Sequence, residues 1–492
     1  MGQRWLKRKK TSSRIKVFLL GLLSPIFLTA CNSRQSIEVP CNSVPSLGNG
    51  GSSLTPSNEG LTLELHVDGS ASMTGYVTLP TSRYRTVLGT IAKIFSLSDN
   101  IASGENTERP VTATQYFRTG FNKQSNQTVQ QNLSRSQFES DAQTQEFYEG
   151  KAEEYKPLTS QITNVIDSTD PTQKVIAIIT DLGQDAGDVT VLNESIQKSI
   201  FSTPGSAVAI LGIRSEFDGV VYDPSTGRRK FEYSTKDQSD QAYRPFYVIL
   251  AGSFPAIQDL LLQIKNRIPF AFETSIFYPN VLKPTFAPPM DNSKGMSPVR
   301  SFQQQQGRES WILKLSDRYQ AFSLNSPDSL TQNPQISLEL DSNPDISQFL
   351  NIPTALKVIA RKFDPSTQDF IDPPSPQGVS LGNLQLTKDT PSQITYDLTI
   401  SPEELANQEA YIYAFRLQAE ALTTPDWWQA WDADQVSPNN NPEGSKPDQV
   451  SPNNNLEGSK TDKLSNFLEG MNDITAEKME TGELCYGFQY LK

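Results

Sequence analysis

A continuous apolar run at residues 174–181 constrains the fold more than any other stretch of the chain. It reads Lys-Val-Ile-Ala-Ile-Ile-Thr-Asp, with apolar residues at five successive positions. Successive side chains of a strand point to opposite faces, so this strand needs cover on both sides. Other apolar runs alternate with segments of helical spacing between residues 61 and 275. The alternation predicts an α/β domain at 61–275 with a doubly wound and mainly parallel sheet.

The pattern changes after residue 306, where apolar and polar residues alternate as in half-buried strands. Turn-forming residues separate the alternating segments and no long helical pattern intervenes, so we predict an all-β sandwich domain at 307–433. The stretch 276–306 is rich in Pro, Asn and Gln and is interpreted as a linker or an irregular surface crossing. The alternating segments lie at 311–315, 336–340, 356–360, 394–400 and 411–417.

Three features follow the predicted sandwich. A tryptophan cluster is interpreted as an apolar plug over the sandwich end, with sugar stacking as the alternative. Two copies of a 14-residue repeat fill residues 434–461, whose composition predicts a disordered surface loop. Apolar residues then recur at helical spacing, which predicts an amphipathic helix within 462–492, capped by Thr461 or Asp462 and packed on one of the domains. The tryptophans are Trp427, Trp428 and Trp431, and the helical positions are Leu464, Phe467, Leu468, Met471 and Ile474.

The first 30 residues have the pattern of a secretory signal peptide. Seven Lys or Arg residues precede a short apolar stretch that ends in Leu28-Thr29-Ala30-Cys31. This ending resembles a bacterial lipobox, so we expect cleavage before Cys31 and acylation of Cys31 as a lipid anchor. A plain signal peptide with an incidental cysteine is the alternative. Residues 31–60 are expected to form a flexible tether, and the expected location is the cell membrane or outer membrane, facing the periplasm or exterior.

The charge of the chain argues against nucleic acid as a partner. Removal of residues 1–30 takes away seven basic and no acidic residues, which leaves 36 basic against 55 acidic residues and a net charge near −19. Such a surface repels phosphate backbones and attracts divalent cations.

Two cysteines, Cys41 and Cys485, remain in the expected mature chain. Export permits a disulfide between them, and two unrelated thiols are the alternative. There is no Cys-x-x-Cys motif and His66 is the only histidine, so neither a cysteine-based metal site nor a Ser-His-Asp triad is supported.

Acidic and hydroxyl side chains follow two of the predicted strands. The strand at 61–68 runs into Asp68-x-Ser70-x-Ser72, and the apolar run at 174–181 ends in Asp181. The carboxyl ends of parallel strands meet at one edge of a sheet, where ligands of α/β proteins bind. We therefore expect these side chains to lie together. A loop that caps the following helix without binding a metal is the alternative.

The pattern Asp68-x-Ser70-x-Ser72 resembles the metal-ion-dependent adhesion site of von Willebrand factor A domains. The resemblance covers about residues 61–270 and implies Mg²⁺ or Mn²⁺, with Ser70 and Ser72 as direct ligands and Asp68 acting through water. It implies Asp181 as the second acidic residue and Thr159 as the threonine, with Thr74 and Thr180 as fallbacks. The family often continues Thr-Asp-Gly, whereas this chain has Thr180-Asp181-Leu182-Gly183.

The resemblance implies a function in adhesion and not in catalysis. An acidic residue of a protein partner would complete the metal shell, so we expect a lipid-anchored lipoprotein that binds a protein through Mg²⁺. One alternative is a metal-assisted hydrolase, for which Asp181, Asp185 or His66 would be the base. Another is a structural envelope protein with a degenerate site. His66, on a strand, is expected to be a packing residue.

Overall fold

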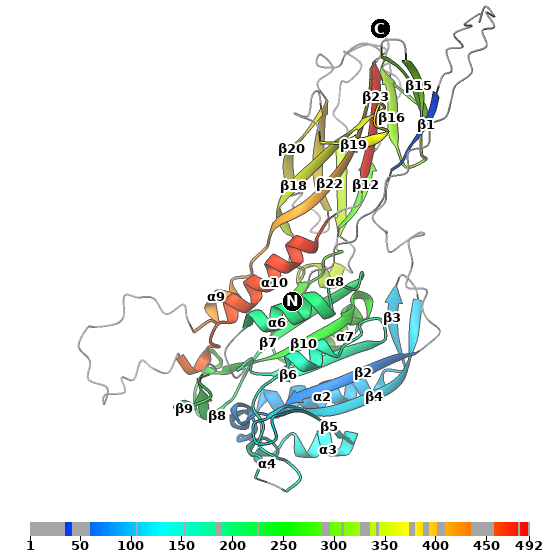
Figure 1. Ribbon diagram of the computed structural model, residues 1–492. Coiled ribbons are helices and arrows are strands. Elements are labelled where there is room, and N and C mark those ends of the chain that lie inside the picture. Colours follow the sequence, from blue (N-terminus) through cyan, green and yellow to red (C-terminus); the bar gives the residue numbers. More distant parts are fainter. Residues whose placement is uncertain are drawn as a thin grey trace, which may run out of the picture.

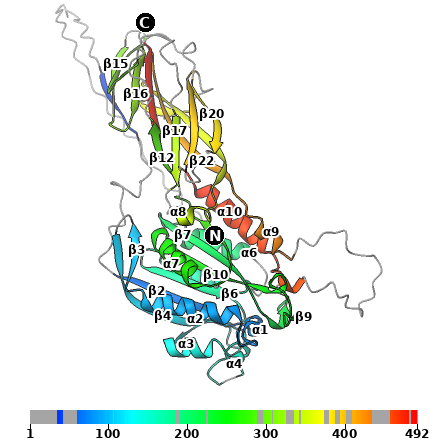
Figure 2. The ribbon, with the colours of Figure 1, turned by 180° about the vertical axis from the view of Figure 1, so that it is seen from behind.

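The computed structural model places an α/β region and a β-rich region one after the other in an elongated molecule (Figure 1). Figure 2 shows the same arrangement from behind. The described residues are 35–41, 60–104, 107–151, 153–183, 189–223, 226–280, 282–287, 296–306, 309–324, 335–340, 344–372, 379–386, 393–400, 409–433, 457–480 and 483–490.

The first region is built on a sheet to which the described residues contribute eight strands. Their order is β11-β7-β10-β6-β2-β4-β3, with β5 paired to β4. The bounds are β2 (Leu61–Asp68), β3 (Asn100–Gly104), β4 (Thr107–Asn122), β5 (Gln127–Leu133), β6 (Lys174–Thr180), β7 (Ser206–Ser215), β10 (Arg244–Ser253) and β11 (Glu273–Phe277).

Helices cover both faces of this sheet, as the apolar run predicts. Val175 and Ile179 of β6 pack on the side of helices α2 and α7, whereas Ile176 and Ile178 pack on the side of α5, α6 and α10. The helices are α1 (Thr74–Val77), α2 (Arg83–Leu97), α3 (Arg135–Asp141), α4 (Gln145–Glu149), α5 (Thr163–Asp167), α6 (Val189–Ser199), α7 (Phe254–Arg267), α8 (Pro344–Ser347), α9 (Trp427–Ala430) and α10 (Leu464–Lys478), with short 3-10 turns η1 (Ala71–Met73) and η2 (Asp240–Ala242).

The sheet is mixed, so the expectation of a mainly parallel sheet is correct only for its centre. β2 pairs in parallel with both β4 and β6, but β10 lies antiparallel between β6 and β7. Strands β7 and β10 are joined through the hairpin of β8 (Asp218–Tyr222) and β9 (Arg229–Ser234) without a crossover helix. Neighbouring parallel strands need such a crossover, so a connection of this kind returns antiparallel.

The second region consists of strands in three sheets within the described residues. One sheet has the order β12-β17-β21-β20, another β13-β16-β23-β22-β18-β19, and the third β1-β15-β14. The bounds are β1 (Gln35–Val39), β12 (Leu282–Ala287), β13 (Met296–Pro298), β14 (Ser301–Gln306), β15 (Glu309–Leu315), β16 (Gln320–Leu324), β17 (Gln335–Leu340), β18 (Pro353–Asp364), β19 (Asp369–Ile371), β20 (Val379–Leu386), β21 (Gln393–Ile400), β22 (Ala410–Leu422) and β23 (Leu484–Tyr490).

The interpretation of residues 276–306 as a linker is wrong. This stretch supplies strands β12, β13 and β14, each at the edge of its sheet. An edge strand can lack one N–H donor, so Pro284 in β12 and Pro298 in β13 are tolerated there. The last residues are also more than a tail, because β23 lies between β16 and β22 inside a sheet.

The expectation of a flexible tether at 31–60 is wrong for residues 35–39. They form β1, which pairs in parallel with β15 and buries Ile37 and Val39 on one face. Residues 40, 41 and 60 are also described. The other residues of the expected tether, Cys31 among them, and the whole signal peptide lie outside the described residues.

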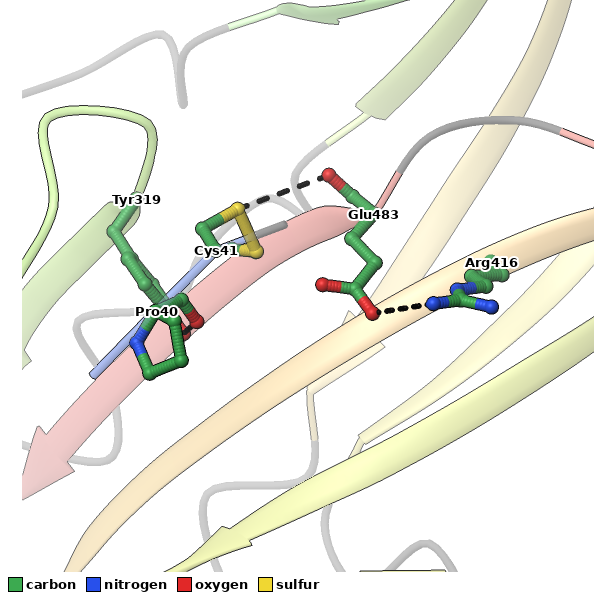
Figure 3. The surroundings of a disulfide bond; sticks show 6 residues. Pro40, Cys41, Tyr319, Arg416 and Glu483 are labelled. Carbon is green, nitrogen blue, oxygen red and sulfur yellow. Dashed lines mark hydrogen bonds and ion pairs between the residues drawn. A yellow bond between two sulfur atoms is a disulfide. The ribbon is translucent and has the colours of Figure 1, made fainter. Parts of the chain in front are cut away.

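The predicted disulfide is confirmed, because Cys41 after β1 is bonded to Cys485 in β23. Figure 3 shows its surroundings, where the Tyr319 hydroxyl donates to the Pro40 carbonyl oxygen at 3.0 Å. Arg416 donates to the Glu483 carboxylate at 2.9 Å on the other side of the bridge. The bond therefore ties the start of the described chain to its last strand.

The tryptophan cluster does not cover the β-rich region. Trp427, Trp428 and Trp431 pack on the α/β sheet, and the Trp428 indole donates to Ser275 Oγ of β11 at 2.9 Å. Gly212 of β7 makes room for them, since a Cβ there would lie 2.8 Å from the Trp431 ring. Their burial argues against sugar stacking.

The predicted C-terminal helix is confirmed as α10, which packs against both α6 and β22 and so connects the two regions. Its first turn is capped by Asp432, whose carboxylate accepts from the Ser465 N–H at 2.7 Å, and not by the predicted Thr461 or Asp462. Residues 434–456 of the repeat lie outside the described residues. The repeat's last five residues, 457–461, are ordered against the α/β region, with Ser459 and Thr461 buried.

Candidate functional site

Parallel pairing brings the ends of β2 and β6 to one place. The register sets Val67 beside Ile179, so Asp68 and Asp181 emerge from neighbouring strands at the same edge of the sheet. Ser70 and Ser72 follow in the turn after β2, and Thr159 reaches the same edge through a bridge to Phe121 of β4. The sequence prediction that these side chains gather is confirmed.

Asp68 is fully buried and lies behind the other residues of the site. Its Oδ1 accepts from the Ser70 N–H at 3.0 Å. Its Oδ2 accepts from the Ser160 hydroxyl at 2.6 Å and from the Thr180 hydroxyl at 2.8 Å. Burial raises the pKa of Asp68 to about 6 and the Asp181 carboxylate adds to the rise, although these hydrogen bonds oppose it.

The part of the site that lines the cavity is a chain of oxygen atoms. Ser70 Oγ and Ser72 Oγ lie 3.0 Å apart, and the Ser72 hydroxyl donates to Asp181 Oδ1 at 3.2 Å. Asp181 Oδ1 also accepts from the Gly183 N–H at 3.0 Å. Ser70, Ser72, Thr159 and Asp181 line one cavity of about 90 Å³.

The structure separates the three candidate threonines. Thr159 lines the cavity and donates to the Phe121 carbonyl oxygen at 3.3 Å. Thr180 instead supports Asp68 from behind, and Thr74 Oγ1 is buried without a hydrogen-bond partner among the described residues. Thr159 is therefore the one of the three that lines the serines' cavity, although helix α5 begins only at Thr163.

Sequence reasoning missed Ser160, Arg244 and the segment at 461–462, which also line the cavity. Ser160 directly follows Thr159, so the pair of adjacent hydroxyl residues was the sequence signal that could have identified Ser160 as a residue of the site. Arg244 is the first residue of β10. Because β10 runs antiparallel to β6, its start lies at the edge where β2 and β6 end. A parallel β10 would have placed Arg244 at the opposite edge.

The free energy of unfolding should depend on pH through Asp68. Its pKa in the folded protein is about 6, above the unfolded value of 3.8, so the folded state holds the proton more tightly. Stability is therefore greatest with Asp68 protonated and falls by roughly 2 kcal/mol as the pH rises from about 4 to about 6. Urea unfolding of the unaltered chain and of Asp68→Asn, both in chelator, checks this. The free energy of unfolding of the variant is subtracted from that of the unaltered chain at each pH. A difference that stays constant over this range would contradict the prediction.

The donor set fits a hard divalent cation, which prefers oxygen ligands. The cavity lining includes the hydroxyl residues Ser70, Ser72 and Thr159 and the carboxylate of Asp181, and Asp223 and Asp462 line it as well. The buried Asp68 carboxylate supports the Ser70 backbone. Within the described part of the chain, no group of three or more His, Cys, Asp or Glu side chains is arranged so that it could hold a metal ion by itself. A site of this kind depends on hydroxyls and needs no such group.

His66 packs in the core, as predicted. Its ring stacks on Phe117 at 4.7 Å between centroids and contacts Thr119 Oγ1 at 3.0 Å and Glu64 Oε2 at 3.4 Å. Burial is the largest influence on the His66 pKa and lowers it. Asp185, the other candidate base, lies outside the described residues.

The chain matches no protein-family model, no curated protein and no solved structure. Its function is therefore inferred from the geometry of the site. In the part of the chain that the structure describes, no helix is long and apolar enough to cross a membrane.

Proposed function

We propose that the chain is a lipid-anchored extracytoplasmic protein that binds a protein partner through a divalent cation at the Ser70–Ser72–Asp181 cavity. The observation that carries the proposal is the convergence of Ser70, Ser72, Thr159 and Asp181 on one cavity, at the edge where β2 and β6 end. Hydroxyl oxygens and one carboxylate are ligands that suit Mg²⁺ or Mn²⁺.

In this proposal Ser70, Ser72 and Thr159 hold the cation and Asp181 holds it directly or through water. Asp68 fixes the turn through the Ser70 N–H. Neutral hydroxyls leave the cation much of its positive charge and an open position, which a carboxylate of the partner can fill. The cation supplies positive charge and a coordination position for that carboxylate.

We also propose that the α/β region is a von Willebrand A-like domain and that the β-rich region is a sandwich. Helices on both faces of the sheet and the order β4-β2-β6 support the first part. The antiparallel β10 is a departure that this proposal has to accommodate. Acylation at Cys31 remains a proposal based on the sequence.

The geometry favours binding over metal-assisted hydrolysis. A hydrolase of this kind needs a base beside the metal-bound water. His66 is buried beside Glu64 and Thr119 and is not among the described residues that line the cavity. Asp181 is held by Ser72 and Gly183.

Binding of the partner should require both the cation and the serine hydroxyls. Full-length tagged protein in detergent would be incubated with envelope extract in Mg²⁺ or in chelator, beside the double variant Ser70→Ala, Ser72→Ala. We expect a protein to be retained only by the unaltered chain and only in Mg²⁺. Thr74→Val is the matched control, because Thr74 is near in sequence but outside the cavity lining. Retention that survives chelation or the double substitution would contradict the proposal.

A further inference from the structure

Arg244 lies in the wall of the proposed cation site. It starts β10 and lines the same cavity as Ser70, Ser72 and Asp181. Its side chain is only 9% exposed, and its Nη2 lies 3.8 Å from Asp181 Oδ2. A cationic side chain beside a cation site opposes metal binding, so its presence needs an explanation.

The Arg244 guanidinium lies over the Phe217 ring, 5.4 Å from its centroid, and interacts with the buried Tyr76 hydroxyl. Nη1 donates to the Gly458 carbonyl oxygen at 3.1 Å and to the Lys460 carbonyl oxygen at 3.4 Å. Nε is buried and has no hydrogen-bond partner among the described residues. Buried donors are normally paired, so this one indicates a missing acceptor. Nε and Nη2 together form the edge of a guanidinium that matches the two oxygens of a carboxylate.

Asp181 shows that a carboxylate can lie between the serines and Arg244. Its Oδ1 accepts from the Ser72 hydroxyl at 3.2 Å, whereas its Oδ2 lies 3.8 Å from Arg244. The distance from the hydroxyl cluster to the guanidinium is therefore one that a single carboxylate group spans.

We infer that Arg244 is a second anchor for the acidic side chain of the protein partner. One carboxylate oxygen completes the shell of the cation, and the other accepts from the guanidinium. The inference rests on the proposed function, because it concerns the same carboxylate. It adds selectivity, since an amide or hydroxyl of a wrong partner can reach the cation but gains little from a positive charge.

Arg244 also offsets the charge of Asp181. An incoming carboxylate approaches that negative group, and repulsion between like charges at short range disfavours its binding. The guanidinium lies beside Asp181 and reduces the repulsion. Arg244 therefore favours the acidic ligand while it weakens the binding of the cation alone.

The test measures Mg²⁺ affinity by calorimetry on the full-length chain in detergent, in chloride and in about 50 mM acetate at equal ionic strength. Acetate is the probe for the partner's carboxylate, and each titration is corrected for Mg²⁺ bound by acetate in solution. Ligands that assist each other's binding do so reciprocally, so we expect acetate to tighten Mg²⁺ binding about fivefold. Acetamide, which has no charge, should have no such effect.

Arg244→Met should bind Mg²⁺ in chloride at least as tightly as the unaltered chain and should lose the acetate effect. Arg214→Met is the matched control. Arg214 donates to the Ser459 carbonyl oxygen at 3.0 Å and holds the same segment, but it is not among the described residues that line the cavity. It should keep the acetate effect. If Arg244→Met does not fold, Arg244→Lys keeps the charge without the planar edge and should show a much smaller effect.

The outcomes separate this inference from the proposed function. If Mg²⁺ binds the unaltered chain in neither buffer, both the inference and the proposed function are overturned. Mg²⁺ binding with no acetate effect, or with an equal effect in the unaltered chain and in the Arg244 variants, overturns the inference and leaves the cation site standing. An acetate effect that is lost in Arg244→Met and kept in Arg214→Met supports the inference.

Discussion

Replacing Cys485 by alanine is expected to lower the free energy of unfolding of the β-rich region by about 4 kcal/mol. The disulfide joins residues 444 positions apart and holds β1 against the sheet system that contains β23. Opening so long a loop gives the unfolded chain much more conformational freedom. Urea unfolding of the full-length chain, with and without reductant, measures the loss.

The controls for this prediction follow from the shared bond. Cys41→Ala should cost about as much as Cys485→Ala, and the double variant should cost little more than either. Reductant should destabilise the unaltered chain and leave both single variants unchanged. A reductant effect of the same size in the variants would show that the Cys41–Cys485 bond is not its source.

Replacing Arg118 by methionine is expected to lower the free energy of unfolding of the α/β region by about 3–5 kcal/mol, because three carbonyl groups lose a buried donor. Arg118 is 1% exposed and donates to the carbonyl oxygens of Phe147 at 2.9 Å, Gly69 at 3.1 Å and Lys156 at 3.0 Å. Burial lowers the pKa of Arg118 to about 10, so it is still charged at neutral pH. Its loss leaves three carbonyl groups without this donor.

The Arg118 variant should also weaken the candidate site. Gly69 stands between Asp68 and Ser70, and Arg118 holds its carbonyl group. The variant should therefore bind Mg²⁺ more weakly even where it remains folded. Arg135→Met is the matched control, since Arg135 forms an exposed pair with Glu139 and should change neither property measurably. A stability loss of equal size in both variants would contradict this account.

Much of the α/β region could be predicted because its signals are local. The run at 174–181 needs cover on both faces, and β6 has it. The direction of β10 is not local, because an apolar run reads the same in either direction. The lack of a helical pattern between 215 and 244 was the available signal. Edge strands such as β12 were missed because proline is compatible with an edge and also with a linker.

The candidate site was predictable where residues follow the ends of parallel strands. Asp68, Ser70, Ser72 and Asp181 share an edge because β2 and β6 are parallel neighbours. Arg244 could not be predicted, since its place depends on the antiparallel direction of β10. The approach of 461–462 to the site depends on tertiary contacts, such as the 2.9 Å hydrogen bond from the Tyr247 hydroxyl to Thr461 Oγ1.

The most direct test of the central claim is a calorimetric titration of the full-length chain with Mg²⁺, beside the double variant Ser70→Ala, Ser72→Ala and the control Thr74→Val. We predict one bound cation in the unaltered chain and in Thr74→Val, and an affinity at least about tenfold weaker in the double variant. Equal Mg²⁺ affinity in the unaltered chain and the double variant, or no binding to the unaltered chain with acetate present, would contradict the claim.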